Sequence, residues 1–525
     1  MAKGYVALVL HAHLPYVRHP EHDNFLEERW LFEAISETYI PLLNTFESLS
    51  NEGVDYKVTM SITPPLLSML SDSLLQERYI RYLEKLISLT DKEIERTKEQ
   101  QEFNLLAKMY NDKYRNDLYI FTTKYNRDLI SVFKSFQDSG KLELIASAAT
   151  HGFLPLMENS NAIRAQVSTG VKVYEKYFGC KPKGIWLPEC GYTPMVENIL
   201  KENAIEYFIT ESHGILFADP KPVFGTYSPI VTPAGIVAFG RDIESSRQVW
   251  SATEGYPGDF DYREFYKDIG YELDYDYIKD YISPDGQRIQ TGIKYFRITD
   301  KTGQKQPYNP IWAHNKVDIH ASNFMFNRQK QIEFLSDKMD RPPIVVCPYD
   351  AELFGHWWYE GPYWLYSLFK KTYYDQNTFK LITLSEYMAE NPVMQVSSPC
   401  PSTWGHKGYN EVWLNTSNDW IYRHLHKSAD RMVELANSNL YAEGLKKDAL
   451  NQAARELLLA QSSDWAFIMK AGTVVPYAIK RTKDHVSRFT KLYHDIKENS
   501  IDEEWLRDIQ SKDNIFPELD YSIYR

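Results

Sequence analysis

Short apolar runs, each followed at once by polar residues, recur through the first 400 residues of the chain. Helix-periodic stretches separate most of these runs. A continuous apolar run has no polar face, so it predicts a strand of a parallel sheet that is buried on both sides. The runs cover residues 5–10, 56–62, 142–146, 184–187, 205–209, 236–239, 344–347 and 379–383.

The polar residues that end these runs favour an α/β fold of the (β/α) barrel type. In such a barrel the carboxyl ends of many strands meet at one face and carry the functional side chains. A doubly wound open sheet, the alternative, would concentrate polar residues at one switch point rather than after nearly every strand. The polar motifs include His11-Ala12-His13, Thr150-His151-Gly152, Pro188-Glu189-Cys190, Arg241-Asp242 and Pro348-Tyr349-Asp350.

Three segments depart from this alternation. A chain of 525 residues is long enough for a large catalytic domain with smaller additions. We expect residues 1–400 to form the barrel, with a charged helical insertion at about 71–140 and a lid-like region at about 251–320. After residue 400 the strands give way to amphipathic helical runs, so residues 401–525 are predicted to form an all-α C-terminal domain against the barrel.

Charge and cysteine usage exclude several classes of protein. The net charge is −12 and acidic and basic residues are interleaved, whereas a nucleic-acid partner requires a basic patch. The four cysteines contain no CxxC pair, so they do not indicate a disulfide framework. The N-terminal apolar run is too short for a signal sequence or a membrane span, so we expect a cytoplasmic protein with no membrane association.

Two carboxylates at predicted strand ends are candidates for catalysis. Glu189 follows the run 184–187 within WLPECG, and Asp350 ends the run that begins at Ile344. Taken alone, each is as easily a buried hydrogen-bonding partner. Together at one barrel face they could flank a glycosidic bond, with one attacking the anomeric carbon and the other protonating the leaving oxygen. A retaining reaction needs the two carboxyl groups about 5–5.5 Å apart.

Histidines occupy comparable positions. His11 and His13 are two residues apart at a strand end, so in a regular strand their side chains point to the same face. His151 and His356 also lie within the motifs that follow strands. These side chains could bind a metal, hydrogen-bond to sugar hydroxyls, or be held by backbone partners inside the barrel, and the residues alone leave these alternatives open.

Tryptophans also concentrate around the same segments. A single tryptophan is more often part of the core than of a binding site, but a set beside strand-end motifs is better explained by stacking on a carbohydrate. The set consists of Trp30, Trp186, Trp250, Trp357, Trp358, Trp404 and Trp413.

With these residues assembled, the chain resembles glycoside hydrolase family 57 over its whole length. Five motifs in order carry the resemblance. They are HAHLP at 11–15, SAATHGFLP at 147–155, GIWLPECGY at 184–192, PYDAELFGHWW at 348–358 and TWGHKGYNEVWLN at 403–415. Three further segments are most similar to the branch of α-1,4-glucan branching enzymes and amylase-like relatives: FLEERWLFEAI at 25–35, AFGRDIESSRQVWS at 238–251 and LLLAQSSDWAFIM at 457–469.

This resemblance implies a role for particular residues. By the family's third and fourth motifs, Glu189 is the nucleophile and Asp350 the acid/base of a retaining mechanism. The implied fold is an incomplete seven-stranded barrel with a helical insertion and a helical C-terminal domain that helps to wall the cleft. No catalytic metal and no cofactor are implied. The substrate-binding residues expected on this basis are His11, His13, Trp30, His151, Tyr227, Arg241, Trp250, His356, Trp404, Trp413 and Asp464.

One position departs from the pattern of the branch. Its fifth motif usually has two glycines after WG and one further residue, and here Lys407 replaces the first of them. A long cation at that position could narrow the groove or change how an acceptor chain lies.

The expected substrate is an α-1,4-glucan such as amylose, glycogen or a starch-like chain, handled by a monomer or small homo-oligomer. A covalent glucosyl-enzyme can be resolved by the 6-hydroxyl of another chain, which gives a branch, or by water, which gives hydrolysis. Branching requires water to be kept out. The Pro- and Gly-punctuated loop at 217–235 could overhang the cleft, and Tyr227 lies near its middle. We therefore expect a branching enzyme, with α-amylase-type hydrolysis or 4-α-glucanotransfer as the alternatives.

Two other classes of protein fit parts of the pattern. An HxH motif after the first strand also occurs in metal-dependent deacetylases and amidohydrolases, where histidines bind a metal that activates water. Metal hydrolysis has no need for Glu189 or for dense aromatics, which count against this class. A non-catalytic glucan-binding protein would need the aromatic residues but not the pair of carboxylates.

Overall fold

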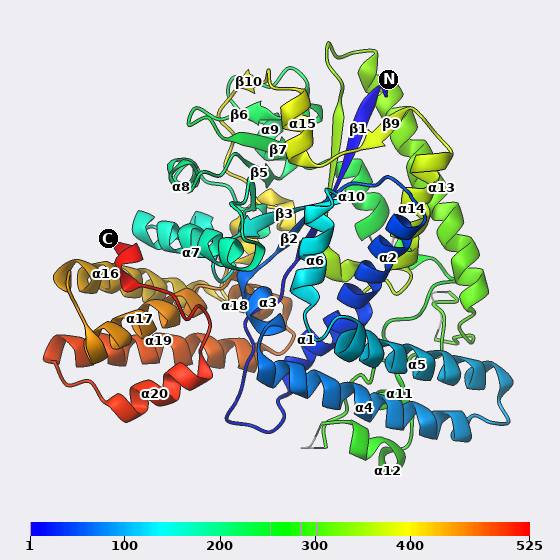
Figure 1. The fold of residues 1–525 in the computed structure, drawn as a ribbon, viewed down its shortest axis with the longest axis horizontal. Helices are drawn as coiled ribbons and strands as arrows, with labels where there is room; N and C mark the ends of the chain where they lie inside the picture. The colour runs from blue at the N-terminus through cyan, green and yellow to red at the C-terminus, as the bar shows by residue number, and fades with distance from the viewer. Residues whose placement is uncertain (1, 252–253, 284–285, 301–302) are drawn as a thin grey trace.

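The structure, a computed structural model, describes residues 2–251, 254–283, 286–300 and 303–525. Its centre is a sheet of seven parallel strands (Figure 1). The prediction of an α/β fold built on a parallel sheet is confirmed. The seven strands are β1 (Gly4–Ala12), β2 (Val58–Ile62), β3 (Leu142–Ser147), β4 (Gly184–Trp186), β5 (Tyr207–Thr210), β7 (Val237–Gly240) and β8 (Ile344–Asp350).

The sheet curves into an incomplete barrel. The hydrogen-bonded order runs from β7 through β5, β4, β3, β2 and β1 to β8, so β7 and β8 are not paired as neighbouring strands. One backbone hydrogen bond, from Asp242 N–H to the carbonyl oxygen of Val346 at 2.9 Å, bridges them. Three short strands complete the sheet: β6 (Ile230–Val231) and β10 (Gln395–Val396) extend it beyond β7, and β9 (Phe379–Leu381) pairs with the start of β1.

Side chains alternate across β1 between two separate cores. Ala7 and Val9 belong to a small cluster with Trp186 and Tyr207, inside the barrel. Val6, Leu8 and Leu10 belong instead to the large core between the sheet and its surrounding helices. Both faces of the strand are buried, which is why its sequence is continuously apolar rather than alternating.

Helices surround the sheet. The helix α7 (Ser160–Phe178) approaches β3 closely, because a Cβ on Gly170 would lie 1.9 Å from the carbonyl oxygen of Ser147. The helices before the C-terminal region are α1 (Arg29–Ala34), α2 (Ile40–Asn51), α3 (Pro64–Leu70), α4 (Ser73–Arg96), α5 (Gln101–Tyr119), α6 (Leu129–Asp138), α7 (Ser160–Phe178), α8 (Val196–Glu202), α9 (Ser212–Leu216), α10 (Ile243–Trp250), α11 (Ile269–Glu272), α12 (Tyr275–Ile278), α13 (Pro310–Ser336), α14 (Gly361–Tyr374) and α15 (Leu384–Glu390).

The segment predicted as a helical insertion folds into α4, α5 and α6, of which α4 and α5 form an antiparallel pair (Figure 1). The described part of 251–320 packs on this pair, since the hydroxyls of Tyr277 and Tyr295 donate to the Glu93 carboxylate at 2.7 and 2.9 Å. Residues 252–253, 284–285 and 301–302 of the predicted lid lie outside the described residues.

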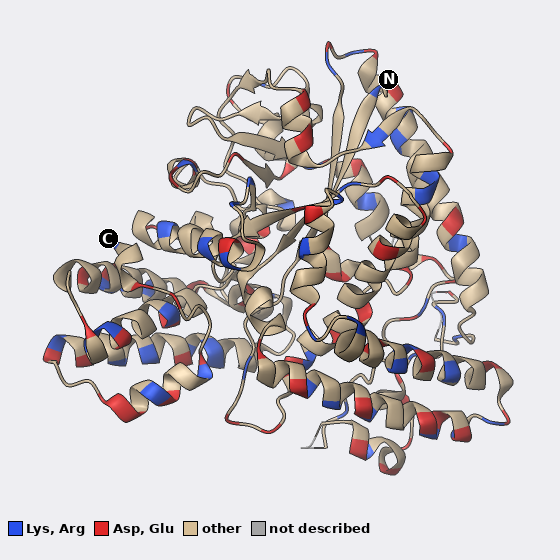
Figure 2. Cartoon of the chain, viewed as in Figure 1, with Lys and Arg blue, Asp and Glu red and all other residues tan. Residues whose placement is uncertain are grey.

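After β10 the described chain is helical. Figure 1 shows these helices gathered on one side of the barrel. They are α16 (Tyr422–Ser438), α17 (Gly444–Ala460), α18 (Ser463–Ala471), α19 (Val475–Glu498) and α20 (Glu503–Lys512). Figure 2 shows acidic and basic residues interspersed along the outer helices rather than separated by sign. In the described part of the chain, no helix combines the length and apolarity of a membrane span.

Candidate active site

Four strand ends and one helix of the C-terminal region meet at the mouth of the barrel. In the β1–β8 pairing His11 lies directly opposite Asp350. His13 follows β1, His151 follows β3 and Glu189 follows β4. The rings of His11 and His13 lie 5.7 Å apart and nearly parallel, so both point to the same side as their spacing predicted.

The backbone of Glu189 has an unusual conformation. It lies in a short 3-10 turn, Pro188–Cys190, and takes the left-handed values φ 62°, ψ 26°. Cys190 and His151 also have positive φ, 49° and 57°. Left-handed backbone is unfavourable for residues with a side chain and tends to persist where the surroundings over-determine it, often at functional sites. Here the backbone N–H of Trp404 helps to hold this conformation by donating to the backbone carbonyl oxygen of Glu189 at 3.0 Å.

Each oxygen of the Glu189 carboxylate accepts a hydrogen bond from a neutral donor. The indole Nε1–H of Trp404 donates to Oε2 at 2.8 Å, and the hydroxyl of Ser463 donates to Oε1 at 3.0 Å. Burial is the main effect on this group and raises its pKa, to which the negative charge of Asp464 adds. The two hydrogen bonds and the nearby His13 oppose that rise by stabilising the ionised form.

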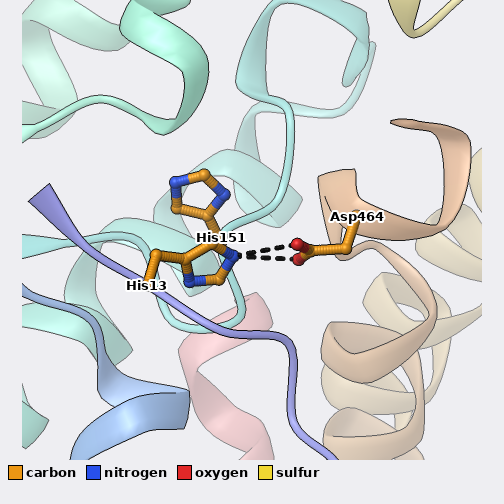
Figure 3. Close-up of side chains that lie close together, drawn as sticks. All are labelled: His13, His151 and Asp464. Atoms are coloured by element: carbon orange, nitrogen blue, oxygen red, sulfur yellow. Dashed lines mark hydrogen bonds and ion pairs between the residues drawn. The ribbon is translucent and has the colours of Figure 1, made fainter. Parts of the chain in front are cut away.

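His13 and Asp464 form an ion pair next to Glu189 (Figure 3). The Nε2 atom of His13 lies 3.1 and 3.0 Å from the two oxygens of Asp464, and its Nδ1 lies 2.9 Å from the hydroxyl of Thr63. Burial favours a neutral imidazole, but the charge and hydrogen bonds of Asp464 outweigh it and raise the pKa of His13. The same pairing lowers the pKa of Asp464 against the effect of burial. The pairing therefore favours the protonated form of His13 next to these carboxylates.

Asp350 is electrostatically different from Glu189. Desolvation, followed by the negative charges of Glu352 and Glu189, raises the pKa of Asp350 to about 8, while His13 and Arg241 oppose the shift. A carboxyl group with this pKa is protonated at neutral pH and can donate a proton. Burial raises the pKa of both carboxyl groups, and the charges of Glu352 and Glu189 add to the rise at Asp350, which suits Asp350 to the part of an acid.

Glu352 is the buried charge behind part of this shift. Its Oε1 accepts hydrogen bonds from the backbone N–H of His13 at 3.1 Å and from the hydroxyl of Tyr39 at 2.6 Å. Both donors bind the same oxygen and fix the carboxyl group of Glu352, whose charge acts on Asp350. Burial raises the pKa of Glu352 itself.

Within the described residues, two groups of side chains have the spacing of a metal site. In His13, His151 and Asp464 one ligand atom from each residue lies within 4.8 Å of the others, and the same holds for Glu456, His485 and Asp513. In the first group His13 and Asp464 are already joined as an ion pair, and His151 is hydrogen-bonded to Ser463 and His11. These bonds occupy the nitrogen and oxygen atoms that a metal would need.

The sequence model of glycosyl hydrolase family 57 matches residues 7–398, which include most of β1, all of β2 to β10 and both carboxylates. This chain belongs to glycosyl hydrolase family 57. The predicted family membership and the incomplete barrel are thereby confirmed. A second sequence model, that of the C-terminal part of 1,4-alpha-glucan branching enzymes, matches residues 424–524 of this family 57 protein.

Similar proteins span almost the whole chain. A 1,4-alpha-glucan branching enzyme of Thermococcus kodakarensis is 34% identical and covers 98% of this chain and 77% of its own. The crystal structure of a family 57 branching enzyme from Pyrococcus horikoshii is 35% identical, covers 99% and 97% of the two chains and has a TM-score of 0.90. The α-amylase AmyC of Thermotoga maritima is 47% identical, covers 99% of each chain and has a TM-score of 0.93.

The structure of the family 57 protein brings most of the predicted residues together. Glu189, His13, His151, Trp404 and Asp464 are linked by hydrogen bonds or ring contacts. His11 joins them through His151, with their Nε2 atoms 3.0 Å apart. Arg241 lies 5.7 Å from the Trp404 ring and forms an ion pair with Glu211 at 2.9 Å.

Other predicted residues have different surroundings. His356 pairs with Glu37, its Nδ1 2.6 Å from a carboxylate oxygen. Trp413 is fully buried and stacks on Phe153. Trp30 contacts Tyr477 edge to face, and Trp250 is 50% exposed at the end of α10. The roles of these residues in binding stay predictions.

Tyr227 lies beside a cavity of about 780 Å³ that Arg241 also lines. Its hydroxyl accepts a hydrogen bond from Gln331 Nε2 on α13 at 3.3 Å. The loop thus lies close to Arg241, while the tyrosine itself is bonded to a helix of the barrel. Its role over the cleft stays a prediction.

Lys407 has an exposed side chain and left-handed backbone, with φ 58° and ψ 10°. This conformation is open to glycine without a steric cost, so it explains a preference for glycine at this position. The substitution by lysine places strain in the backbone of the fifth motif.

Sequence reasoning missed three residues that contact the site: Ser463, Glu352 and Glu211. Ser463 directly precedes Asp464, and Glu352 lies two residues after Asp350 within a quoted motif. Proximity to a named residue was therefore the available signal. Which neighbour turns toward the site depends on how α18 and the turn after β8 are oriented, and the sequence pattern does not give that.

Proposed function

We propose that this chain is a 1,4-α-glucan branching enzyme that works by retaining double displacement, with Glu189 as nucleophile and Asp350 as acid/base. The proposal includes an α-1,4-glucan as substrate. It also includes the division into a barrel of residues 1–400 and a C-terminal domain of residues 401–525 that completes the cleft. We further infer that the protein acts in the cytoplasm as a monomer or small homo-oligomer.

The two halves of the reaction assign a task to each carboxyl group. In the first, the Glu189 carboxylate attacks the anomeric carbon, the α-1,4 C–O bond breaks, and the proton of Asp350 passes to the departing 4-oxygen. In the second, the Asp350 carboxylate takes the proton of a 6-hydroxyl, whose oxygen attacks the anomeric carbon and releases Glu189. The raised pKa of Asp350 supports its role as the proton donor in the first half.

One observation carries the choice of branching. The region that matches the branching-enzyme C-terminal model contains Ser463 and Asp464. Ser463 hydrogen-bonds to Glu189, and Asp464 pairs with His13. The C-terminal helices thus supply part of the surroundings of the nucleophile, and the part that they supply is the one shared with branching enzymes.

Hydrolysis of the α-amylase type is the second candidate. The 47% identity with an α-amylase over 99% of both chains favours it. The hydrogen bond between Tyr227 and Gln331 also favours it, because a tyrosine bonded to α13 does not by itself exclude water from the glucosyl-enzyme. The same pair of carboxylates could serve branching, hydrolysis or 4-α-glucanotransfer.

Incubation with amylose tests the proposal. Linkage analysis measures new α-1,6 branch points, and a reducing-sugar assay measures hydrolysis. We expect the number of new α-1,6 branch points to exceed the number of new reducing ends, both measured on the product before any debranching treatment. Reducing ends without α-1,6 linkages would identify a hydrolase, and new α-1,4 chain lengths without either product would identify a glucanotransferase.

Tyr227→Ala tests the loop separately. If Tyr227 helps to keep water from the glucosyl-enzyme, its removal raises reducing-end release relative to α-1,6 linkages by about two- to tenfold, a change of roughly 0.4–1.4 kcal/mol in the relative barriers. Gln331→Ala is the matched control, because it removes the hydrogen-bond partner and leaves the phenol in place. An unchanged ratio in Tyr227→Ala would remove this role from Tyr227.

A further inference from the structure

A chain of hydrogen bonds links the proposed nucleophile to two buried histidines. It runs from Glu189 Oε1 to the Ser463 hydroxyl at 3.0 Å, and from that oxygen to His151 Nδ1 at 2.9 Å. It ends with the 3.0 Å contact between His151 Nε2 and His11 Nε2. The donors and acceptors in this chain are not independent of one another, because each neutral group has only one proton to give.

The direction of the chain follows from the carboxylate. An ionised Glu189 accepts hydrogen bonds and donates none, so the single hydroxyl proton of Ser463 points to it. The Ser463 oxygen then accepts from its other neighbour, which requires a proton on Nδ1 of His151. A neutral imidazole with a proton on Nδ1 has a bare Nε2.

The same argument extends to His11. The bare Nε2 of His151 is an acceptor, so the Nε2 of His11 carries the proton between them. His11 Nδ1 is then unprotonated. That atom is buried and has no hydrogen-bond partner among the described residues. A buried acceptor without a partner is less costly than a buried N–H without one, which agrees with this tautomer.

Both imidazoles stay neutral. His11 and His151 are each only 2% exposed, and His151 stacks against the cationic His13 at 3.8 Å between ring centroids. Burial, together with the charge of His13, lowers the pKa of both groups well below the ordinary value. A second proton on either ring would place two adjacent cations in a desolvated site.

We propose that Ser463 is a positioning residue for the nucleophile, held by a one-way relay in which His11 donates to His151, His151 donates to Ser463 and Ser463 donates to Glu189. With Trp404 on the other oxygen, the relay fixes the carboxylate in a single orientation through neutral donors. The inference rests on the role of Glu189 given under Proposed function. It adds a fixed tautomer for each histidine and a residue from α18 that was not among the expected site residues.

Neutron diffraction from a deuterated crystal of the full chain tests the relay without reference to activity. We expect deuterium on His151 Nδ1 and on His11 Nε2, with His151 Nε2 and His11 Nδ1 bare. Deuterium on His151 Nε2, or on both nitrogens of either ring, would overturn the relay. This outcome is independent of whether Glu189 is the nucleophile, which the loss of turnover in Glu189→Gln decides.

Ser463→Ala tests the positioning role through the pH profile of kcat/KM. The charged groups that face Glu189 are Asp464 on α18, His13 after β1 and Asp350 at the end of β8. All three remain in the variant. Loss of the hydroxyl donor destabilises the ionised carboxylate, so the acidic limb of the profile moves to higher pH by about one unit. Ser463→Thr keeps the donor and restores the limb.

Ser462→Ala is the matched control. Its hydroxyl donates to Asp464 at 2.6 Å rather than to Glu189, so the acidic limb stays close to that of the unchanged enzyme. A uniform fall in kcat in Ser463→Ala, with the limb unmoved, would show that Ser463 only packs there and would overturn the positioning role. Failure of Ser463→Thr to restore the limb would do the same.

Discussion

Two clusters of histidine and carboxylate side chains in this protein share one geometry but have different surroundings. His13, His151 and Asp464 lie at the barrel mouth, and the side chains of His13 and Asp464 keep 11% and 17% of their exposure. Glu456, His485 and Asp513 lie among the C-terminal helices with no exposure at all. Spacing alone therefore does not distinguish a reactive site from a structural one.

The neighbours of the two clusters distinguish them. Arg481 and Arg488 both pair with Asp513, and Gln452 donates to Glu456, so the carboxylates of the buried cluster are paired with residues that join α17 and α19 to the chain at 513. The mouth cluster instead adjoins left-handed backbone at Glu189 and His151 and a carboxyl group with a pKa of about 8. Strain and separated pKa values mark function, whereas closed pairing marks stability.

The largest expected effect is at Glu189, which adjoins the mouth cluster. Glu189→Gln removes the proposed nucleophile at nearly unchanged volume: its amide oxygen can accept from Trp404, and its NH2 group then faces the Ser463 hydroxyl, which can turn to accept, so we expect the fold to be retained. We expect branching and hydrolysis to fall together by about ten-thousandfold or more. Initial rates on amylose, with circular dichroism to confirm folding, check this. Appreciable residual turnover would remove Glu189 as nucleophile and weaken the contrast between the two clusters.

The buried cluster should respond in the opposite way. Asp513→Asn leaves the guanidinium groups of Arg481 and Arg488 without their counter-charge, and breaking a buried pair costs about 3–5 kcal/mol. We expect the free energy of unfolding to fall by about that amount while kcat per folded molecule stays within about twofold. Urea denaturation and rates on amylose measure the two quantities.

Arg507→Gln is the control for this variant. It breaks an exposed pair with Glu503, whose side chain is 55% exposed, so unfolding should change by less than about 1 kcal/mol. A large loss of kcat in Asp513→Asn under conditions where it is folded would mean that the buried cluster also acts on the reaction.

A smaller effect is expected from Glu352. An acid must be protonated, so kcat/KM falls as pH rises through the pKa of Asp350, near pH 8. Glu352→Gln removes a negative charge that raises this pKa, and the alkaline limb should therefore move to lower pH, by about one unit. The exposed Glu158→Gln is the control and should leave the limb in place. A limb that moves upward would contradict the proposed sign.

The smallest effect is expected from metal removal. In the mouth cluster a proton already joins His13 to Asp464, and in the buried cluster arginines neutralise the carboxylates. Exhaustive dialysis against EDTA should therefore change the rate on amylose by less than about twofold. Loss of activity that a divalent cation restores would favour the metal-dependent hydrolase class instead.

Much of the barrel, and the strand-end positions of the two candidate carboxylates, could be predicted from local pattern, whereas their proposed roles came from the resemblance to the family. A strand buried on both faces must be continuously apolar, as β1 is, and the residue that ends such a strand lies at the mouth, as Asp350 does. The same spacing rule placed His11 and His13 on one side. These features depend on residues close together in sequence, where backbone geometry is fixed.

The surroundings of the pair depended on tertiary structure. Ser463 and Glu189 are 274 residues apart, and they meet because α18 docks beside the turn after β4. Docking also decided that Trp413 is buried against Phe153, and that His356 is bonded to Glu37. The sequence by itself determined which strands form the barrel and which residues end them. Only the packing of helices from distant parts of the chain decided which side chains contact the nucleophile, because such contacts have no period in sequence.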